Sequence, residues 1–100
     1  MRQTVMLVYK ALYRKMMDAL KDAGMWLDWA DQLKKDCPDV AKYLYESAKA
    51  RLETDFPETH QHFVKACAAD KENKHCLSEM VEEHMMDWYD GMMNRIKRWS

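Results

Sequence analysis

The chain has 100 residues, of which 48% are hydrophobic and 33% charged, and its formal net charge is −1. This length suits one domain, residues 1–100, and leaves no room for a second. The near-zero charge excludes the basic surface on which non-specific nucleic-acid binding depends, and no apolar run is long enough to span a membrane. We therefore expect a protein that folds in water and binds neither nucleic acid nor membrane.

The cysteines and the N-terminal residues indicate in which cellular compartment the protein is found. The three cysteines, Cys37, Cys67 and Cys76, are odd in number and form no C-x-x-C pair, which is not typical of a secreted disulfide framework. The opening segment MRQTVMLVYKAL lacks the apolar core of a signal peptide. Both observations predict a cytoplasmic protein.

A first helix is predicted from about residue 3 to 35. Only two Gly and two Pro occur in the whole chain, so local preference is helical almost throughout. At 100° per residue, one narrow apolar stripe runs along this segment. The stripe consists of Val5, Tyr9, Leu12, Met16, Ala19, Leu20, Ala23, Leu27 and Ala30.

A second helix should begin after the segment KKDCPDV, because Asp36 can cap a helix and Pro38 suits a first helical turn. Pro57 lies in its middle and either kinks one long helix or splits it in two. The predicted core stripe of this helix is Ala41, Leu44, Ala48, Leu52, Asp55, Thr59, Phe63 and Ala66.

A third helix should follow the polar turn DKENKH, residues 70–75, and continue to Trp99. Its predicted core stripe is Leu77, Val81, Met85, Trp88, Met92, Ile96 and Trp99. Three long helices joined by short turns predict an all-α fold, an antiparallel up-down-up bundle.

Histidines and carboxylates near the core raise the question of a metal site. Asp55 and His62 fall on or near the second stripe, and His84 lies near the third, so these three could form an unconventional metal site. The alternative is that Asp55 begins a capping box around Pro57, with His62 packed at a helix edge. We favour the capping interpretation and expect no cofactor. On the same helix, His60 is expected to be exposed.

Four apolar residues are not explained by the core stripes: Met25, Trp29, Met86 and Met93. Part of the wide apolar arc on the third helix follows from packing against two neighbours. Trp29, one turn from Met25 and opposite the first stripe, is not accounted for in this way. Because Met and Trp are enriched in interfaces, these residues predict a contact surface for a protein partner or for a second copy in a homodimer.

No catalytic constellation is recognisable. Neither a nucleophile elbow nor a Gly-rich phosphate loop occurs, so we expect a protein that is not an enzyme. A methionine-rich helical bundle of this kind suits an interaction module, an adaptor or inhibitor of a larger protein, of the type that phages and mobile elements encode.

The segments DALKDAGMWLDWADQLKKDCPDVAKYLYESAKARL and MVEEHMMDWYDGMMNRIKRW resemble small ferritin-like or rubrerythrin-like helical bundles of phage or gut bacteria. The resemblance implies an antiparallel bundle that binds iron at paired carboxylates and Glu-x-x-His motifs. This chain departs from the motif, because Val81 stands three residues before His84. A ferritin-like metal-binding bundle with a degenerate site at Asp55, His62 and His84 is therefore the alternative function.

Overall fold

The structure is a computed structural model that describes residues 2–69 and 79–99, with side chains for residue 4, residues 6–69 and residues 82–99. All regular elements in these ranges are helical: α1 (Arg2–Leu33), α2 (Pro38–Ala50), the π-helical turn η1 (Arg51–Asp55), α3 (Phe56–Ala69) and α4 (Glu79–Arg98). Since α2, η1 and α3 follow without a break, they form one joined helix, which we call the α2–α3 helix. The predicted all-helical class is confirmed.

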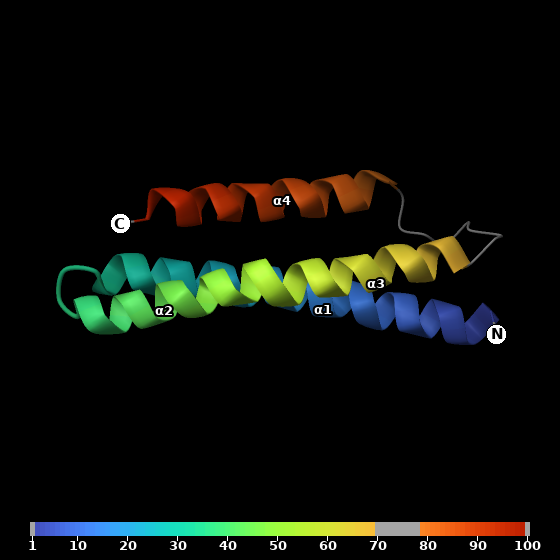
Figure 1. The fold of residues 1–100 in the computed structure, drawn as a ribbon, viewed down its shortest axis with the longest axis horizontal. Coiled ribbons are helices and arrows are strands. Elements are labelled where there is room, and N and C mark those ends of the chain that lie inside the picture. The colour runs from blue at the N-terminus through green and yellow to red at the C-terminus, as the bar shows by residue number, and fades with distance from the viewer. Residues whose placement is uncertain (1, 70–78, 100) are drawn as a thin grey trace.

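The helices lie lengthwise against one another in a rod that measures 53 × 21 × 16 Å (Figure 1). The N-terminus lies at one end, and the loop between α1 and α2 lies at the other, near the C-terminus. The turn predicted at residues 70–75 lies outside the described residues. In the part of the chain that the structure describes, none of the helices combines the length and the apolarity that crossing a bilayer requires.

The long helix α1 carries the apolar stripe predicted for it. Leu12 is half-buried, and the side chain of Val5 lies outside the described ones. The other stripe members are all buried, namely Tyr9, Met16, Ala19, Leu20, Ala23, Leu27 and Ala30. This agreement follows from an apolar period close to 3.6 that nothing interrupts along α1.

The helix α2 is capped by a different residue from the one predicted. The Cys37 N–H donates to the Leu33 carbonyl at 2.8 Å, and Cys37 itself is the N-cap of α2, without a side-chain capping bond. Pro38 is the first helical residue, as predicted, but Asp36 is not the cap. Residues 34–36 form the turn between the helices, so Asp36 lies one position before the cap, which Cys37 occupies.

The π-helical turn precedes Pro57 directly. Proline lacks an N–H, and its ring clashes with the carbonyl four residues earlier in an α-helix, here that of Glu53. In η1 the Phe56 N–H donates instead to the Arg51 carbonyl, five residues back. This wider turn accommodates the ring, and the helix continues to Ala69. Of the two alternatives for Pro57, the joined helix contradicts a split and fits a kink.

The wider turn also changes which residues enter the core. Phe56 is 1% exposed, whereas the Asp55 side chain is 44% exposed. Thr59 and Phe63 are buried as predicted. The prediction that Asp55 belongs to the core stripe is wrong. A π-helical turn holds one more residue than an α-helical turn, so the face after it is rotated relative to an uninterrupted helix.

Helix α4 completes the core with Met85, Met92 and Ile96, all buried as predicted. Trp88, however, is 36% exposed, so its prediction as a core residue is wrong. In its place Tyr89 packs inward and stacks on Phe56. Of the other predicted core residues, Leu44 and Trp99 are half-buried, whereas Leu77 and Val81 lie outside the described side chains.

Candidate functional site

Three large apolar side chains surround one open hollow between α1 and α4. Met25 is 41% exposed, Trp29 45% and Trp88 36%. All three line a cavity of about 530 Å³. The remaining lining residues are Lys21, Gly24, Asp28, Gln32, Met92 and Arg95. The hollow is thus built from the outer flank of α1 and one edge of α4.

The local sequence explains why this hollow exists. Met25 and Trp29 are one turn apart and lie roughly 140–180° around α1 from Met16 in the core stripe. Between that flank and the core stands Gly24, which lies against Met92: a Cβ at Gly24 would be in ordinary contact with the Met92 methyl carbon, 3.5 Å away. The thioether therefore packs over the backbone of α1 and forms the floor of the hollow.

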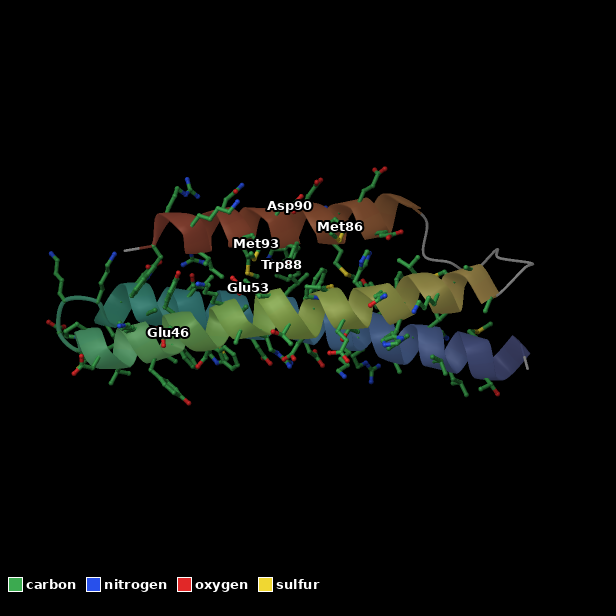
Figure 2. All side chains as sticks on the ribbon, in the orientation of Figure 1. Glu46, Glu53, Met86, Trp88, Asp90 and Met93 are labelled. Carbon is green, nitrogen blue, oxygen red and sulfur yellow. The ribbon has the colours of Figure 1, made fainter. Side chains whose placement is uncertain are left out.

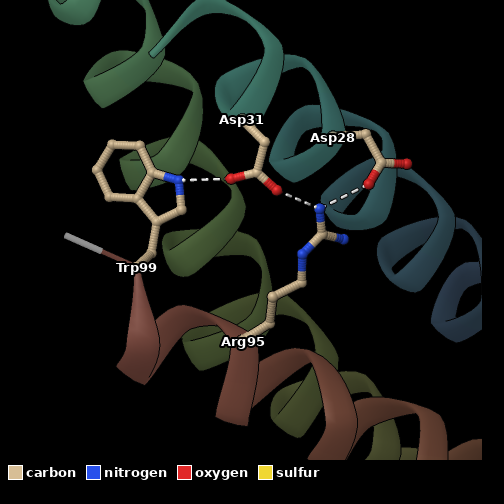
Figure 3. Close-up of polar contacts among 4 residues, drawn as sticks. All are labelled: Asp28, Asp31, Arg95 and Trp99. Carbon is tan, nitrogen blue, oxygen red and sulfur yellow. Dashed lines mark hydrogen bonds and ion pairs between the residues drawn. The ribbon is translucent and has the colours of Figure 1, made fainter. Parts of the chain in front are cut away.

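Arg95 closes one end of the hollow and fixes α4 against α1. Its Nη2 donates to Asp28 Oδ1 at 2.6 Å and to Asp31 Oδ2 at 2.7 Å (Figure 3). The hydrogen bond to Asp31 raises the pKa of Arg95 above its ordinary value, Asp28 adds to this effect, and partial burial opposes it. The guanidinium therefore stays charged and bridges two successive turns of α1.

Trp99 fastens the end of α4 to both neighbouring helices. Its Nε1–H donates to Asp31 Oδ1 at 3.0 Å (Figure 3), and its ring stacks on Tyr45 with 4.3 Å between centroids. On the same indole ring, Lys34 Nζ lies 4.8 Å from the centroid. The Tyr45 hydroxyl donates to the Ile96 carbonyl at 3.3 Å. These contacts hold the walls of the hollow at a fixed spacing.

A second hollow of about 500 Å³ adjoins the first along α1. It is lined by Lys10, Tyr13, Arg14, Met17, Asp18 and Lys21, and Lys21 also lines the first hollow. We call the two together the α1/α4 groove. It follows α1 from Lys10 to Gln32, a length of roughly 33 Å at 1.5 Å per residue.

The α1/α4 groove carries an excess of positive charge. Lys10, Arg14 and Lys21 are all exposed. Among the described residues, none of these three cations takes part in an ion pair, whereas Asp28 is paired with Arg95. Asp18 is the one further acid that lines the groove within the described residues.

Of the four contact residues predicted from the sequence, two line the groove and two do not. Met25 and Trp29 line the α1/α4 groove, but Met86 and Met93 do not. Both are half-buried and pack against the core, extending from α4 toward the neighbouring helices in Figure 2. They lie roughly 140–160° around α4 from Trp88. The edge of α4 that lines the α1/α4 groove is therefore its Trp88 edge.

The residues of the alternative metal site are not brought together. Asp55 accepts a hydrogen bond from Arg51 Nη1 at 2.8 Å, and Arg51 Nη2 also reaches Asp22 at 3.2 Å. His62 and His84 are both exposed. Within the described ranges, no three His, Cys, Asp or Glu side chains are grouped so that they could hold a metal ion.

His60 takes the inward place expected for His62. Its ring lies parallel to Phe56 with 6.1 Å between centroids, and Nε2 lies 3.0 Å from Glu82 Oε1. With 25% of its side chain exposed, His60 is half-buried, so its prediction as an exposed residue is wrong. The rotation introduced by η1 accounts for the exchange, and Pro57 was the sequence signal that could have indicated it.

The groove residues that sequence reasoning missed include Trp88, Lys10 and Arg14, whereas the sequence predicts Lys21 in a polar rim around Met25 and Trp29. The cations could have been recognised, because positions 10, 14 and 21 recur at the four- and seven-residue spacing of one helix face. For Trp88 no such signal exists, because apolar residues occupy α4 on several sides.

No protein-family model matches this chain, nor does any curated protein or solved structure. The functional assignment therefore depends on the groove.

Proposed function

We propose that this protein is a small, non-enzymatic, cytoplasmic interaction module that acts as an adaptor or inhibitor of a larger protein, which docks in the α1/α4 groove. The observation that carries the proposal is the arrangement of Met25, Trp29 and Trp88 around one hollow, each with more than a third of its surface exposed. Exposed Trp at the centre of a hollow is typical of an energetic centre of binding.

The bundle that presents the groove is proposed to be up-down-up and antiparallel. In support, Tyr9 stacks on Phe63 and Arg51 pairs with Asp22, so residue numbers fall on the α2–α3 helix as they rise on α1. In the contacts between α4 and the α2–α3 helix, residue numbers likewise fall on one helix as they rise on the other. In the contacts between α4 and α1, residue numbers rise on both helices.

The composition of the groove favours a protein ligand. The indole groups contribute a large apolar area with few rotatable bonds, and the thioether groups adapt their shape to the surface they meet. Both properties suit binding to a protein surface. Around them Lys21, Asp28 and Gln32 provide a polar rim. An apolar centre with a polar rim is the usual anatomy of a protein–protein interface.

The test is a selection of helical segments about 20 residues long from a display library on the immobilised protein, at a length that matches the groove. Binding of the selected segments is then measured for Trp29→Ala and Trp88→Ala. We expect each change to weaken binding by about 30-fold, the equivalent of about 2 kcal/mol. Tyr43→Ala is the matched aromatic control, because Tyr43 is 70% exposed and lies on α2, outside the groove.

Circular dichroism during thermal unfolding establishes that all three variants are folded. Segments that bind equally well to wild type and to both Trp variants would show that the groove is not the docking surface. Failure to select any segment would also count against the proposal.

A further inference from the structure

We infer that the segment that occupies the α1/α4 groove is an acidic amphipathic helix of the partner protein. This inference rests on the proposed function and specifies the chemistry of the partner. Three features of the groove lead to it: the satisfied backbone of its walls, its length and its charge.

The walls of the groove determine that the occupant is helical. The described residues that line the groove are all helical: α1 and α4 line the first hollow, and α1 lines the second. The backbone N–H and C=O groups of these helices are bonded within each helix and offer no edge for a strand to join. A segment that buries its apolar side here must therefore satisfy its own backbone, and a helix does so. Met25 and Trp29, both exposed, line the groove to receive such a helix, and the half-buried Tyr13 and Met17 line it further along α1.

The length of the groove sets the size of the occupant. From Lys10 to Gln32 the groove extends roughly 33 Å, which corresponds to a helix of about 20 residues. A helix of that length presents five to six turns, so one apolar stripe can cover both hollows. Such docking of a helix in a groove uses anchors at i, i+3 or i+4 and i+7.

The charge of the groove determines that the occupant is acidic. Lys10, Arg14 and Lys21 lie on one side of α1 and have no ion-pair partner among the described residues. Of the described acids that line the groove, Asp28 is paired with Arg95, which leaves Asp18 to oppose the three cations. This local excess of two positive charges contrasts with the net charge of −1 of the whole chain. Carboxylates along both edges of an apolar stripe would pair with these cations and exclude basic competitors.

A second copy of this chain fits the groove less well. In a two-fold symmetric dimer the groove would meet its copy in reverse, so Lys10 and Arg14 of one copy would face the Trp29 end of the other. The acid at that end, Asp28, is already paired with Arg95 and leaves the cations without a partner. A head-to-tail contact could offer the exposed acids of α4, Glu83, Asp87 and Asp90. Their apolar neighbours Met86 and Met93 already pack against the core of their own copy. Self-association is therefore an outcome that the test must detect.

The experiment extends the display selection by reading the charge of the enriched segments. We expect net negative segments with carboxylates flanking an apolar stripe. Charge reversal at the groove, Lys10→Glu/Arg14→Glu/Lys21→Glu, should weaken the tightest binder by roughly 30-fold or more at low salt, from three close charge pairs. The control Lys35→Glu/Lys42→Glu/Lys65→Glu changes the net charge equally at exposed positions outside the groove, and should change binding by less than about 3-fold.

A salt titration of the wild type keeps the inference testable if the reversed variant does not fold. Affinity for an acidic helix should fall as salt rises, because exposed charge pairs are screened over about 8–10 Å at physiological ionic strength. Replacing each Glu of the binder by Gln should abolish that salt dependence.

The outcomes separate this inference from the proposed function. Binders that need Trp29 but are neutral or basic would overturn the acidic helix and leave the docking groove intact. Binders that need neither Trp29 nor Trp88 would overturn both. Sedimentation that shows a dimer of the wild type and a monomer of Trp29→Ala would assign the groove to a second copy and overturn the inference.

Discussion

Phe56 and Tyr89 stack with their ring centroids 4.5 Å apart and their planes inclined by 12°, which joins the start of α3 to the middle of α4. Burial raises the pKa of the Tyr89 hydroxyl above 10.0, and the negative charges of Asp90 and Glu53 raise it further. Figure 2 labels both acids, Asp90 on α4 and Glu53 on the α2–α3 helix. The folded protein therefore favours the neutral phenol more than the unfolded chain does.

The first prediction is a loss of stability in alkali that depends on Tyr89. Because its pKa is raised on folding, its contribution is fully present below about pH 10 and is lost as pH rises through the higher folded value. Urea unfolding at pH 8 and pH 11 should show a smaller drop for Tyr89→Phe than for wild type. Tyr43→Phe, at a position 70% exposed, is the control. Equal drops in all three proteins would show that the phenol of Tyr89 is not the responsible group.

The second prediction contrasts two large-to-small changes. Leu52 is 0% exposed, so Leu52→Ala should lower the free energy of unfolding by about 2–5 kcal/mol. Trp88→Ala should lower it by only about 1–2 kcal/mol, because over a third of Trp88 stays in water. Denaturant unfolding measures both. A larger loss for Trp88→Ala than for Leu52→Ala would place Trp88 inside the core.

The third prediction concerns the two glycines, both of which lie within helices. At Gly91 a Cβ would meet nothing within 4 Å, so Gly91→Ala should stabilise the protein by about 0.5–1 kcal/mol through helix propensity. At Gly24 the added Cβ would make ordinary contact with Met92, 3.5 Å away, so Gly24→Ala should stabilise it comparably. Thermal unfolding of the two variants checks this. Destabilisation by Gly24→Ala alone would mean that α1 and α4 approach more closely than described.

The fourth prediction addresses the alternative ferritin-like function. Protein purified without chelator should contain no stoichiometric iron or zinc, because His62 and His84 are exposed and Asp55 is held by Arg51. Elemental analysis of wild type and His84→Ala is the measurement. Stoichiometric metal that disappears in the variant would support the metal-binding bundle in place of the interaction module.

Helix α1 could be predicted residue by residue, whereas the α2–α3 helix could not. The apolar period of α1 is uninterrupted, so counting at 100° per residue identifies the buried face from Tyr9 to Ala30. In the second helix the same counting correctly places Thr59 and Phe63 in the core, but it is wrong at other positions around η1. It predicts that Asp55 and His62 face inward, whereas Phe56 and His60 do so. Local sequence marks a proline, but not how the preceding turn accommodates it.

For α4 the difficulty is a different one. Met85, Met86, Trp88, Tyr89, Met92, Met93 and Ile96 are distributed around much of this helix. Such a helix can be rotated by one residue without losing apolar contact, so periodicity alone does not choose between Trp88 and Tyr89. The choice is made by tertiary partners: Phe56 receives Tyr89, and Asp28 and Asp31 hold Arg95 on the opposite edge.

Because of the π-helical turn, the packing of α3 depends on the number of residues from Arg51 to Asp55. Deleting one residue there would restore a regular α-helix and rotate everything that follows by roughly 100°. Phe56 and Phe63 would leave the core together, and His60 would lose Glu82. A single-residue deletion in this segment should therefore be more damaging than most substitutions in the protein. Homologues that share this packing should vary in sequence here while preserving chain length.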